Sequence, residues 1–340
     1  MQQRDKSGYK YVFVCGLHRS GTTVLGRNIA RLEKCTGFKN TPRSSDEEGQ
    51  VLQDVYPVDT EFGGAGRFGF DPRAHLTEAS DLLTPANVRK LRAQWHSYWD
   101  ESKAICVEKT PGNLLMTRFM QAAFPNSYFI MIKRHPIAVS MATQKLKGPG
   151  IVWKLKPASL HYLFEHWLHC HRIFEQDKKC LNHVYELTYE DYIQNPASYH
   201  REIAAFMGTR VPEGVMEEIT GAYNKKYLDR WRELLTNSFF RNYYRYIARK
   251  YESRFAAHGY SLVNGLGLSE EIFQERGKLS GEIGALYCFG ADVAAFLRRF
   301  WTLKPKEQMK QWLPEFILKR IRRARQRALL NRRKTGAVST

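Results

Sequence analysis

The chain has 340 residues, 43% of them hydrophobic and 13% aromatic, a length and composition that support a sizeable core and exclude wholesale disorder. Lysine and arginine total 53 against 34 aspartates and glutamates, which gives a formal net charge of +19. A charge this large predicts an anionic partner: nucleic acid, a membrane surface, or a ligand that carries phosphate or sulfate.

Strands alternate with helices over the first two thirds of the chain. Short runs of β-branched and aromatic residues predict strands over 11–15, 105–107, 128–132 and 183–189. Helices are predicted over 22–33, 112–123, 136–145, 159–177 and 190–207, the last one interrupted near Pro196. This alternation predicts an α/β fold, a P-loop-like three-layer sandwich with a central parallel sheet and helices on both faces.

Residues 37–75 depart from this alternation. They are rich in Gly, Pro, Asp and Ser and have weak periodicity, which is typical of a functional or disordered loop. The loop also carries the aromatic residues Tyr56, Phe62, Phe68 and Phe70. These aromatic rings either stack on a sugar ligand or belong to the core, and the sequence leaves both interpretations open.

The C-terminal part of the chain is helical in pattern and basic. Residues 304–334 contain 12 Lys or Arg and two Glu, a net charge of +10 (12 minus 2). Apolar side chains fall near one helical stripe there, so this segment is expected either to lie on an anionic membrane surface or to pack on the domain. We therefore divide the chain into a domain over 1–265 and a basic helical C-terminal extension over 266–340.

Two features bear on localisation. No run reaches the roughly 18 consecutive apolar residues of a membrane span. The first ten residues do not resemble a secretory signal. We therefore expect a cytoplasmic protein, with peripheral contact at the inner membrane face through residues 304–334.

The segment Gly16–Thr23, GLHRSGTT, follows a predicted strand and opens a predicted helix. Backbone N–H groups in such a turn, together with the helix N-terminus, bind an anion. Gly21 permits a close backbone approach, and Arg19 adds a guanidinium suited to phosphate. A nucleotide-triphosphatase loop would carry Lys where Thr22 stands. The sequence therefore predicts an anion loop, and a nucleotide kinase is kept as an alternative.

The run RSGTT after an apolar strand resembles the loop of sulfotransferases that binds the 5′-phosphosulfate of 3′-phosphoadenosine-5′-phosphosulfate (PAPS). In that family an Arg at the end of a later strand, and a Ser six residues on, hold the 3′-phosphate. The run IMIKRHPIAVSMA places Arg134 and Ser140 at this spacing. The resemblance implies PAPS as cofactor and a sulfotransferase domain over about residues 9–265.

Three further stretches are similar to this family. Residues 108–111, EKTP, resemble a run whose Lys, here Lys109, lies near the sulfuryl group. Residues 187–191, LTYED, resemble an element whose Tyr, here Tyr189, lies near the adenosine. Residues 46–57 resemble an acceptor-side loop. The absence of Lys from the anion loop, where Arg19 stands, favours the branch that acts on glycans, lipids or tyrosyl proteins.

The resemblance and the chemistry together define a set of site residues. The expected PAPS-binding residues are His18, Arg19, Ser20, Gly21, Thr22, Thr23, Arg134, Ser140 and Tyr189. Arg19 and Lys109 are expected to stabilise the charge that develops on the departing nucleotide. A general base must take the acceptor proton. Glu48, beside Gly49, is the preferred base, and Glu47, His18 and Asp54 are alternatives.

Sulfuryl transfer of this kind requires no metal. His161, His166, His169, Cys170 and His171 cluster on the helix predicted over 159–177. A zinc site there would need ligands from elsewhere, so these residues are interpreted as ordinary helix positions.

The predicted function is transfer of the PAPS sulfuryl group to a hydroxyl of a carbohydrate, glycolipid or similar acceptor. The alternatives are a tyrosyl-protein sulfotransferase, a nucleotide kinase, and a non-enzymatic basic binding protein. Nucleic acid is not the expected partner.

Overall fold

The structure is a computed structural model that describes residues 8–41, 48–144, 160–214, 216–217, 221–238 and 241–264. The chain divides into two compact units, Met1–Cys288 and Phe289–Thr340. The predicted extension over 266–340 lies outside the described residues, and so does Glu47. The boundary at 265 and the membrane-binding tail therefore stay predictions.

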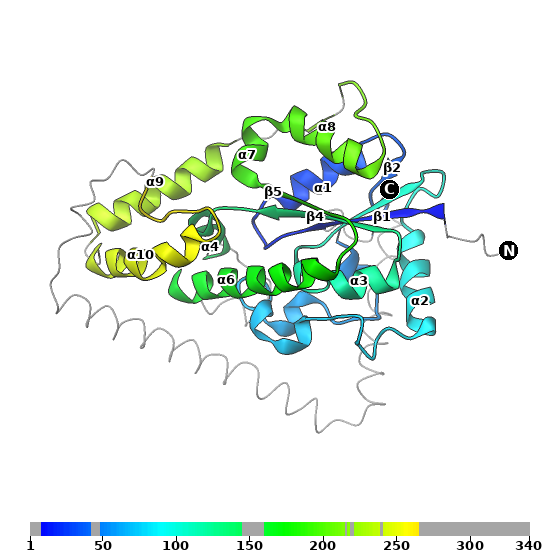
Figure 1. Ribbon diagram of the computed structural model, residues 1–340, viewed down its shortest axis with the longest axis horizontal. Coiled ribbons are helices and arrows are strands. Elements are labelled where there is room, and N and C mark those ends of the chain that lie inside the picture. Colours follow the sequence, from blue (N-terminus) through cyan, green and yellow to red (C-terminus); the bar gives the residue numbers. More distant parts are fainter. Residues whose placement is uncertain are drawn as a thin grey trace, which may run out of the picture. The chain divides into compact units, whose positions relative to one another are not determined.

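Five parallel strands form the central sheet, in the order β2-β3-β1-β4-β5 (Figure 1). They are β1 (Lys10–Cys15), β2 (Cys35–Thr36), β3 (Ile105–Lys109), β4 (Ser127–Lys133) and β5 (Val184–Thr188). The four predicted strands and the parallel α/β architecture are confirmed. The strand β2 escaped prediction because it has only two residues, paired with the start of β3.

Helices cover both faces of the sheet (Figure 1). The α-helices in chain order are α1 (Thr22–Ala30), α2 (Pro85–His96), α3 (Thr117–Ala123), α4 (Pro136–Gln144), α6 (Leu160–Asp177), α7 (Tyr189–Gln194), α8 (Pro196–Met207), α9 (Ala222–Thr236) and α10 (Arg241–Ala256). Because side chains alternate along a strand, Val12 and Val14 pack toward α1 and α8, whereas Tyr11 and Phe13 pack toward α2, α3 and α6.

One helix prediction needs adjustment, and the predicted interruption of another is confirmed. The single helix expected over 112–123 is a 3-10 helix at Pro111–Leu115 followed by α3. The helix expected over 190–207 is divided as predicted, with α7 ending before Asn195 and α8 beginning at Pro196. Proline has no backbone N–H to continue the first helix, but it fits the first turn of the second.

Residues 48–75, the part of the predicted loop that the structure describes after residue 41, contain more regular structure than their composition suggests. They contain short 3-10 helices, and the side chains of Tyr56 and Phe68 are only 4% and 2% exposed. The interpretation that these two rings stack on a sugar ligand is therefore wrong, since they already pack in the core.

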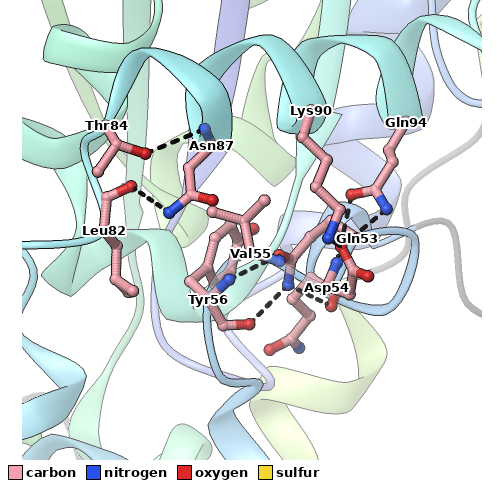
Figure 2. A network of polar contacts seen from close by, with 10 residues as sticks. Gln53, Asp54, Val55, Tyr56, Leu82, Thr84, Asn87, Lys90 and Gln94 are labelled. Atoms are coloured by element: carbon pink, nitrogen blue, oxygen red, sulfur yellow. Dashed lines mark hydrogen bonds and ion pairs between the residues drawn. The ribbon is translucent and has the colours of Figure 1, made fainter. Parts of the chain in front are cut away.

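Figure 2 shows how part of this loop is attached to α2. The side-chain oxygen Oε1 of Gln53 accepts hydrogen bonds from the backbone N–H groups of Val55 and Tyr56, at 2.6 and 2.8 Å. Asp54 pairs with Lys90 of α2 at 2.7 Å and accepts a hydrogen bond from Gln94 at 2.9 Å. These contacts give Asp54 a structural role, which weakens its candidacy as a base.

Phe129→Ala is expected to lower the free energy of unfolding by about 3–5 kcal/mol. Phe129 is fully buried on β4, and its ring stacks on that of Phe13 with centroids 5.4 Å apart. Urea denaturation would measure the loss. Val51→Ala is the control, because Val51 is 40% exposed and its truncation should change stability by about 0.5 kcal/mol or less. A loss below about 1 kcal/mol at Phe129 would contradict this account of the core.

Candidate functional site

The turn between β1 and α1 has the backbone geometry of an anion loop. Arg19 and Gly21 both have positive φ angles, 70° and 96°, which folds the chain tightly before the helix. A Cβ atom on Gly21 would lie 2.5 Å from the ring of Tyr189, so only glycine fits. No side chain caps the N-terminus of α1. Its first N–H groups therefore remain available for an anion.

Arg134 joins this turn to the end of β4. Its Nη1 donates to the backbone oxygen of Arg19 at 2.7 Å, and its Nε donates to Asn224 Oδ1 at 3.0 Å. The guanidinium lies 4.1 Å from the centroid of the Tyr189 ring. Burial lowers the pKa of Arg134. The structure thus brings together three predicted site residues, and it adds Asn224, which sequence reasoning missed because it lies on a distant helix.

Several buried polar atoms around this turn have no hydrogen-bond partner among the described residues. They are His18 Nδ1, Ser20 Oγ, Arg134 Nη2 and Ser140 Oγ. Buried polar groups are nearly always paired in folded proteins, and an unpaired one costs about 1–3 kcal/mol. All four atoms belong to residues predicted to bind PAPS. A hydroxyl, a guanidinium N–H and loop amides are suitable donors for phosphate and sulfate oxygens, so these residues fit the nucleotide.

The remaining residues predicted to bind PAPS differ in their exposure to solvent. Thr22 is buried at the start of α1, whereas Thr23 and the side chain of Arg19 are exposed. Tyr189 is buried at the start of α7. The exposed position of Arg19 leaves its guanidinium accessible to a ligand.

Lys109 and Glu48, two of the three predicted catalytic residues, belong to one chain of contacts. Lys109 Nζ donates to Glu48 Oε1 at 2.9 Å, and the Gln50 amide nitrogen donates to Glu48 Oε2 at 2.8 Å. The Gln50 amide oxygen accepts from the backbone N–H of Asp59 at 3.0 Å. Asp59 Oδ2 lies 2.6 Å from His18 Nε2. A single network therefore connects the anion loop to the segment that carries Glu48.

His18 and Asp59 form a buried ion pair. Burial disfavours the charged form of each group, but the opposite charge on the partner stabilises that form by more. The pKa of His18 is therefore raised above its ordinary value, and the pKa of Asp59 is lowered. A protonated His18 can donate from Nδ1. This favours a role as a cationic donor toward the nucleotide and disfavours His18 as the general base.

Glu108 is a candidate positioning residue that sequence reasoning passed over. It is fully buried on β3 and accepts hydrogen bonds from the backbone N–H of Gly49 at 2.8 Å and from the side chains of Thr110 and Asn113. Burial raises its pKa to about 7. Because Gly49 follows Glu48, Glu108 fixes the turn that presents the Glu48 carboxylate. The sequence around Glu108 gives no local sign of its contact with Gly49, which lies 59 residues away in the chain.

Trp95 fixes the same turn from α2. Its indole Nε1 donates to the backbone oxygen of Gly49 at 3.0 Å. A Cβ atom on Gly49 would lie 2.7 Å from Glu108 Oε1 and 2.8 Å from the Trp95 ring. Glycine is therefore required there for close packing.

The histidines of α6 are packed structural residues. The His166 ring accepts a hydrogen bond from the backbone N–H of Gly69 at 3.1 Å, and burial lowers the pKa of His166 to about 3. His171 is bonded to the backbone oxygen of Trp167 at 2.7 Å. Within the described ranges there is no group of three or more His, Cys, Asp or Glu residues that could hold a metal ion.

Comparison with known proteins identifies one family. A family model described as "Sulfotransferase family" matches residues 12–213, which contain every predicted site residue. No curated protein matches the chain.

Solved structures resemble the chain only weakly. A sulfotransferase from Mycobacterium tuberculosis H37Rv is 15% identical, with a TM-score of 0.40, over 79% of this chain and 77% of that one. The sulfotransferase domain of an olefin synthase from Synechococcus PCC 7002 is 15% identical, with a TM-score of 0.40, over 86% of this chain and 98% of that one. A retinol dehydratase in complex with androsterone and the inactive cofactor PAP is 12% identical, with a TM-score of 0.31, over 85% of this chain and 81% of that one. At these scores only the family model identifies the chain.

Glu108→Gln is expected to remove a pH dependence of stability. The Glu108 pKa is about 7 in the folded chain against an ordinary value of 4.5, so the folded chain binds more protons between these pH values. The free energy of unfolding should therefore fall by about 3 kcal/mol as pH rises through this window. The variant should lack this component in urea denaturation across pH. The exposed Glu33→Gln variant should retain it, and identical slopes in wild type and Glu108→Gln would refute the assignment.

Asp59→Asn is expected to lower the pKa of His18 below its ordinary value of 6.5. The substitution keeps the size of the side chain but removes the carboxylate, so that burial acts on the imidazole unopposed. An NMR titration of the His18 ring would measure the shift. Asp71→Asn is the control, since Asp71 pairs with Arg73 and not with His18. The ion pair would be disproved by an unchanged His18 titration in Asp59→Asn.

Proposed function

The chain belongs to the sulfotransferase family, and we propose that PAPS is its sulfuryl donor and a hydroxyl of a carbohydrate or glycolipid its acceptor. The observation that carries this proposal is the group of unpartnered buried donors on Ser20, Arg134 and Ser140. They come from the ends of two adjacent strands and the helices that follow. A ligand with two separate anionic groups, as in PAPS, would satisfy donors arranged in this way.

The chain's own residues would divide the binding of the nucleotide between them. The N–H groups at the start of α1 and the Ser20 hydroxyl would bind the 5′-phosphosulfate. Arg134 Nη2 and the Ser140 hydroxyl would bind the 3′-phosphate. The Tyr189 ring, which stacks on the Arg134 guanidinium, would lie near the adenosine. PAPS supplies the activated sulfuryl group, and the protein positions it.

The cations around the anion loop would stabilise the negative charge that develops during transfer. In-line transfer breaks the bond between sulfur and the bridging phosphate oxygen, and the negative charge on that oxygen grows. Lys109, Arg19 and the protonated ring of His18 are the groups available to stabilise it, and they are most effective where water is excluded. Lys109 is 9% exposed in its side chain, so its charge is poorly screened.

Glu48 is the base that the geometry favours. Its side chain is 22% exposed and lies 2.9 Å from Lys109, so an acceptor hydroxyl can reach the carboxylate beside the sulfuryl group. Glu108 and Trp95 hold the turn that carries it. Lys109 would orient Glu48 before transfer and stabilise negative charge during it. The acceptor proton would pass to Glu48 as the new sulfur–oxygen bond forms.

The cellular location remains part of this proposal. Within the residues that the structure describes, no helix combines the length and apolar character needed to cross a membrane. We place the enzyme in the cytoplasm on the sequence expectation alone. The basic tail over 304–334 would then approach a membrane that carries a lipid-linked acceptor.

Calorimetric titration with adenosine 3′,5′-bisphosphate and with ATP, both in EDTA, tests the donor. Selective micromolar binding of the bisphosphate is expected. Arg134→Ala should weaken it by about 30-fold, because a buried charged hydrogen bond is lost. Ser140→Ala, which is less disruptive to folding, should weaken it by about fivefold.

Arg201→Ala is the matched control for this titration, because Arg201 is exposed on α8 and its loss should leave binding unchanged. No binding of the bisphosphate would overturn the proposal. A preference for ATP that requires magnesium would instead support a nucleotide kinase.

A further inference from the structure

An open groove runs beside α1 from the proposed transfer site toward the edge of the sheet. Its volume is about 440 Å³. Thr23 and Lys109 line the end nearest the anion loop, and Arg27 and Arg31 line the wall formed by α1. Lys39 lies on the opposite wall. The groove is therefore continuous with the site at Lys109 and extends away from it.

The groove exists because the edge strand β2 is short. Cys35 and Thr36 pair with Ile105 and Cys106, and the chain then leaves the sheet at Gly37. In the described part of the chain, the edge of β3 from Val107 onward therefore has no paired strand beside it. The groove lies at this edge, between α1 and the segment that follows β2.

Both walls of the groove are held in place. The Phe38 ring stacks on Trp99, with centroids 4.9 Å apart and planes 13° apart, and the backbone N–H of Lys39 donates to Tyr98 at 2.8 Å. On the other side, α1 packs against β3, and a Cβ atom on Gly26 would lie 2.9 Å from the Lys109 side chain. The groove is therefore a preformed feature of the fold.

The lining carries more cationic than acidic side chains: four of its residues are cationic and one, Glu217, is acidic. Two of these cations also have acidic partners beside the groove, since Lys109 pairs with Glu48 at 2.9 Å and Lys39 with Asp100 at 3.3 Å. Glu217 is shared between Arg27 and Arg31 at 3.8 Å from each, beyond hydrogen-bond distance. These side chains are 35–40% exposed, and exposed pairs of this kind are weak. An anionic ligand could therefore replace Glu217 as the partner of Arg27 and Arg31 with little loss of interaction energy.

We propose that this groove is the acceptor subsite and that it selects an elongated acidic acceptor, a glycan chain bearing carboxylates or similar acids. This inference rests on the proposed sulfuryl transfer and specifies its acceptor. Arg31 follows Thr23 by eight residues, which is about 12 Å along a helix. The recognised acid would thus lie roughly two sugar units from the hydroxyl that receives the sulfuryl group, so a compact phenol could not contact both ends.

Binding of a matched pair of oligosaccharides tests this subsite. The probes are an unsulfated chondroitin oligosaccharide, whose glucuronates carry carboxylates, and the same material after reduction of those carboxylates to alcohols. Calorimetry is done on the protein saturated with adenosine 3′,5′-bisphosphate. The acidic probe should bind at least about tenfold more tightly than the reduced one, and added salt should weaken it.

The double variant Arg31→Glu, Lys39→Glu should weaken the acidic probe by at least about tenfold. Its affinity for the bisphosphate should stay unchanged, because neither residue belongs to the nucleotide site. Arg201→Glu, Arg232→Glu is the matched control: it makes the same change in charge at exposed positions outside the groove and should bind both probes as the wild type does.

Equal binding of the two probes, no binding of either, or equal effects of the two double variants would each overturn the acidic-acceptor proposal. These results are distinguishable from failure of the proposed function, which would appear as loss of bisphosphate binding by the wild-type protein. Bisphosphate binding without discrimination between the probes would leave the donor assignment standing and reject the acceptor subsite alone.

Discussion

The parallel pairing of β1 with both β3 and β4 is the constraint on which the site depends. Parallel strands end at the same edge of a sheet, and here the register pairs Val14 with Lys109 on one side and Cys15 with Met131 on the other. The anion loop after β1 is thereby flanked by Lys109 and by the turn that carries Arg134. The two cations lie on opposite sides of one loop because β1 lies between β3 and β4.

The turn that carries Glu48 is positioned by a different kind of contact. A buried carboxylate, Glu108, accepts a hydrogen bond from the backbone N–H of Gly49 in this turn. Trp95 of α2 donates a second hydrogen bond to the same residue. The sheet thus positions the anion loop directly through strand ends, and it positions Glu48 through hydrogen bonds to a long connection. Buried residues such as Glu108 and Trp95 therefore both pack in the interior and fix the site.

The sequence indicated the strands of the sheet, the anion loop and most of the residues around it, because each depends on local patterns. Arg134 and Ser140 were found because their spacing resembles that of the family's 3′-phosphate site. Asn224, Glu108 and the role of Asp59 were not predictable, since each depends on contact between segments far apart in the chain. The short β2 gave no periodic signal. The groove follows from its early end, so it could be recognised only in three dimensions.

The orientation of Gln50 has one further consequence. Its amide nitrogen donates to Glu48 while its amide oxygen accepts from Asp59, which in turn holds His18. A carboxamide in this position fixes the orientation of both of its neighbours. It cannot relay a proton between them, because it neither gains nor loses a proton at physiological pH. Gln50 therefore links the positions of Glu48 and His18 but cannot carry a proton between them. If Glu48 takes the acceptor proton, as we propose, that proton has no path to the imidazole through Gln50.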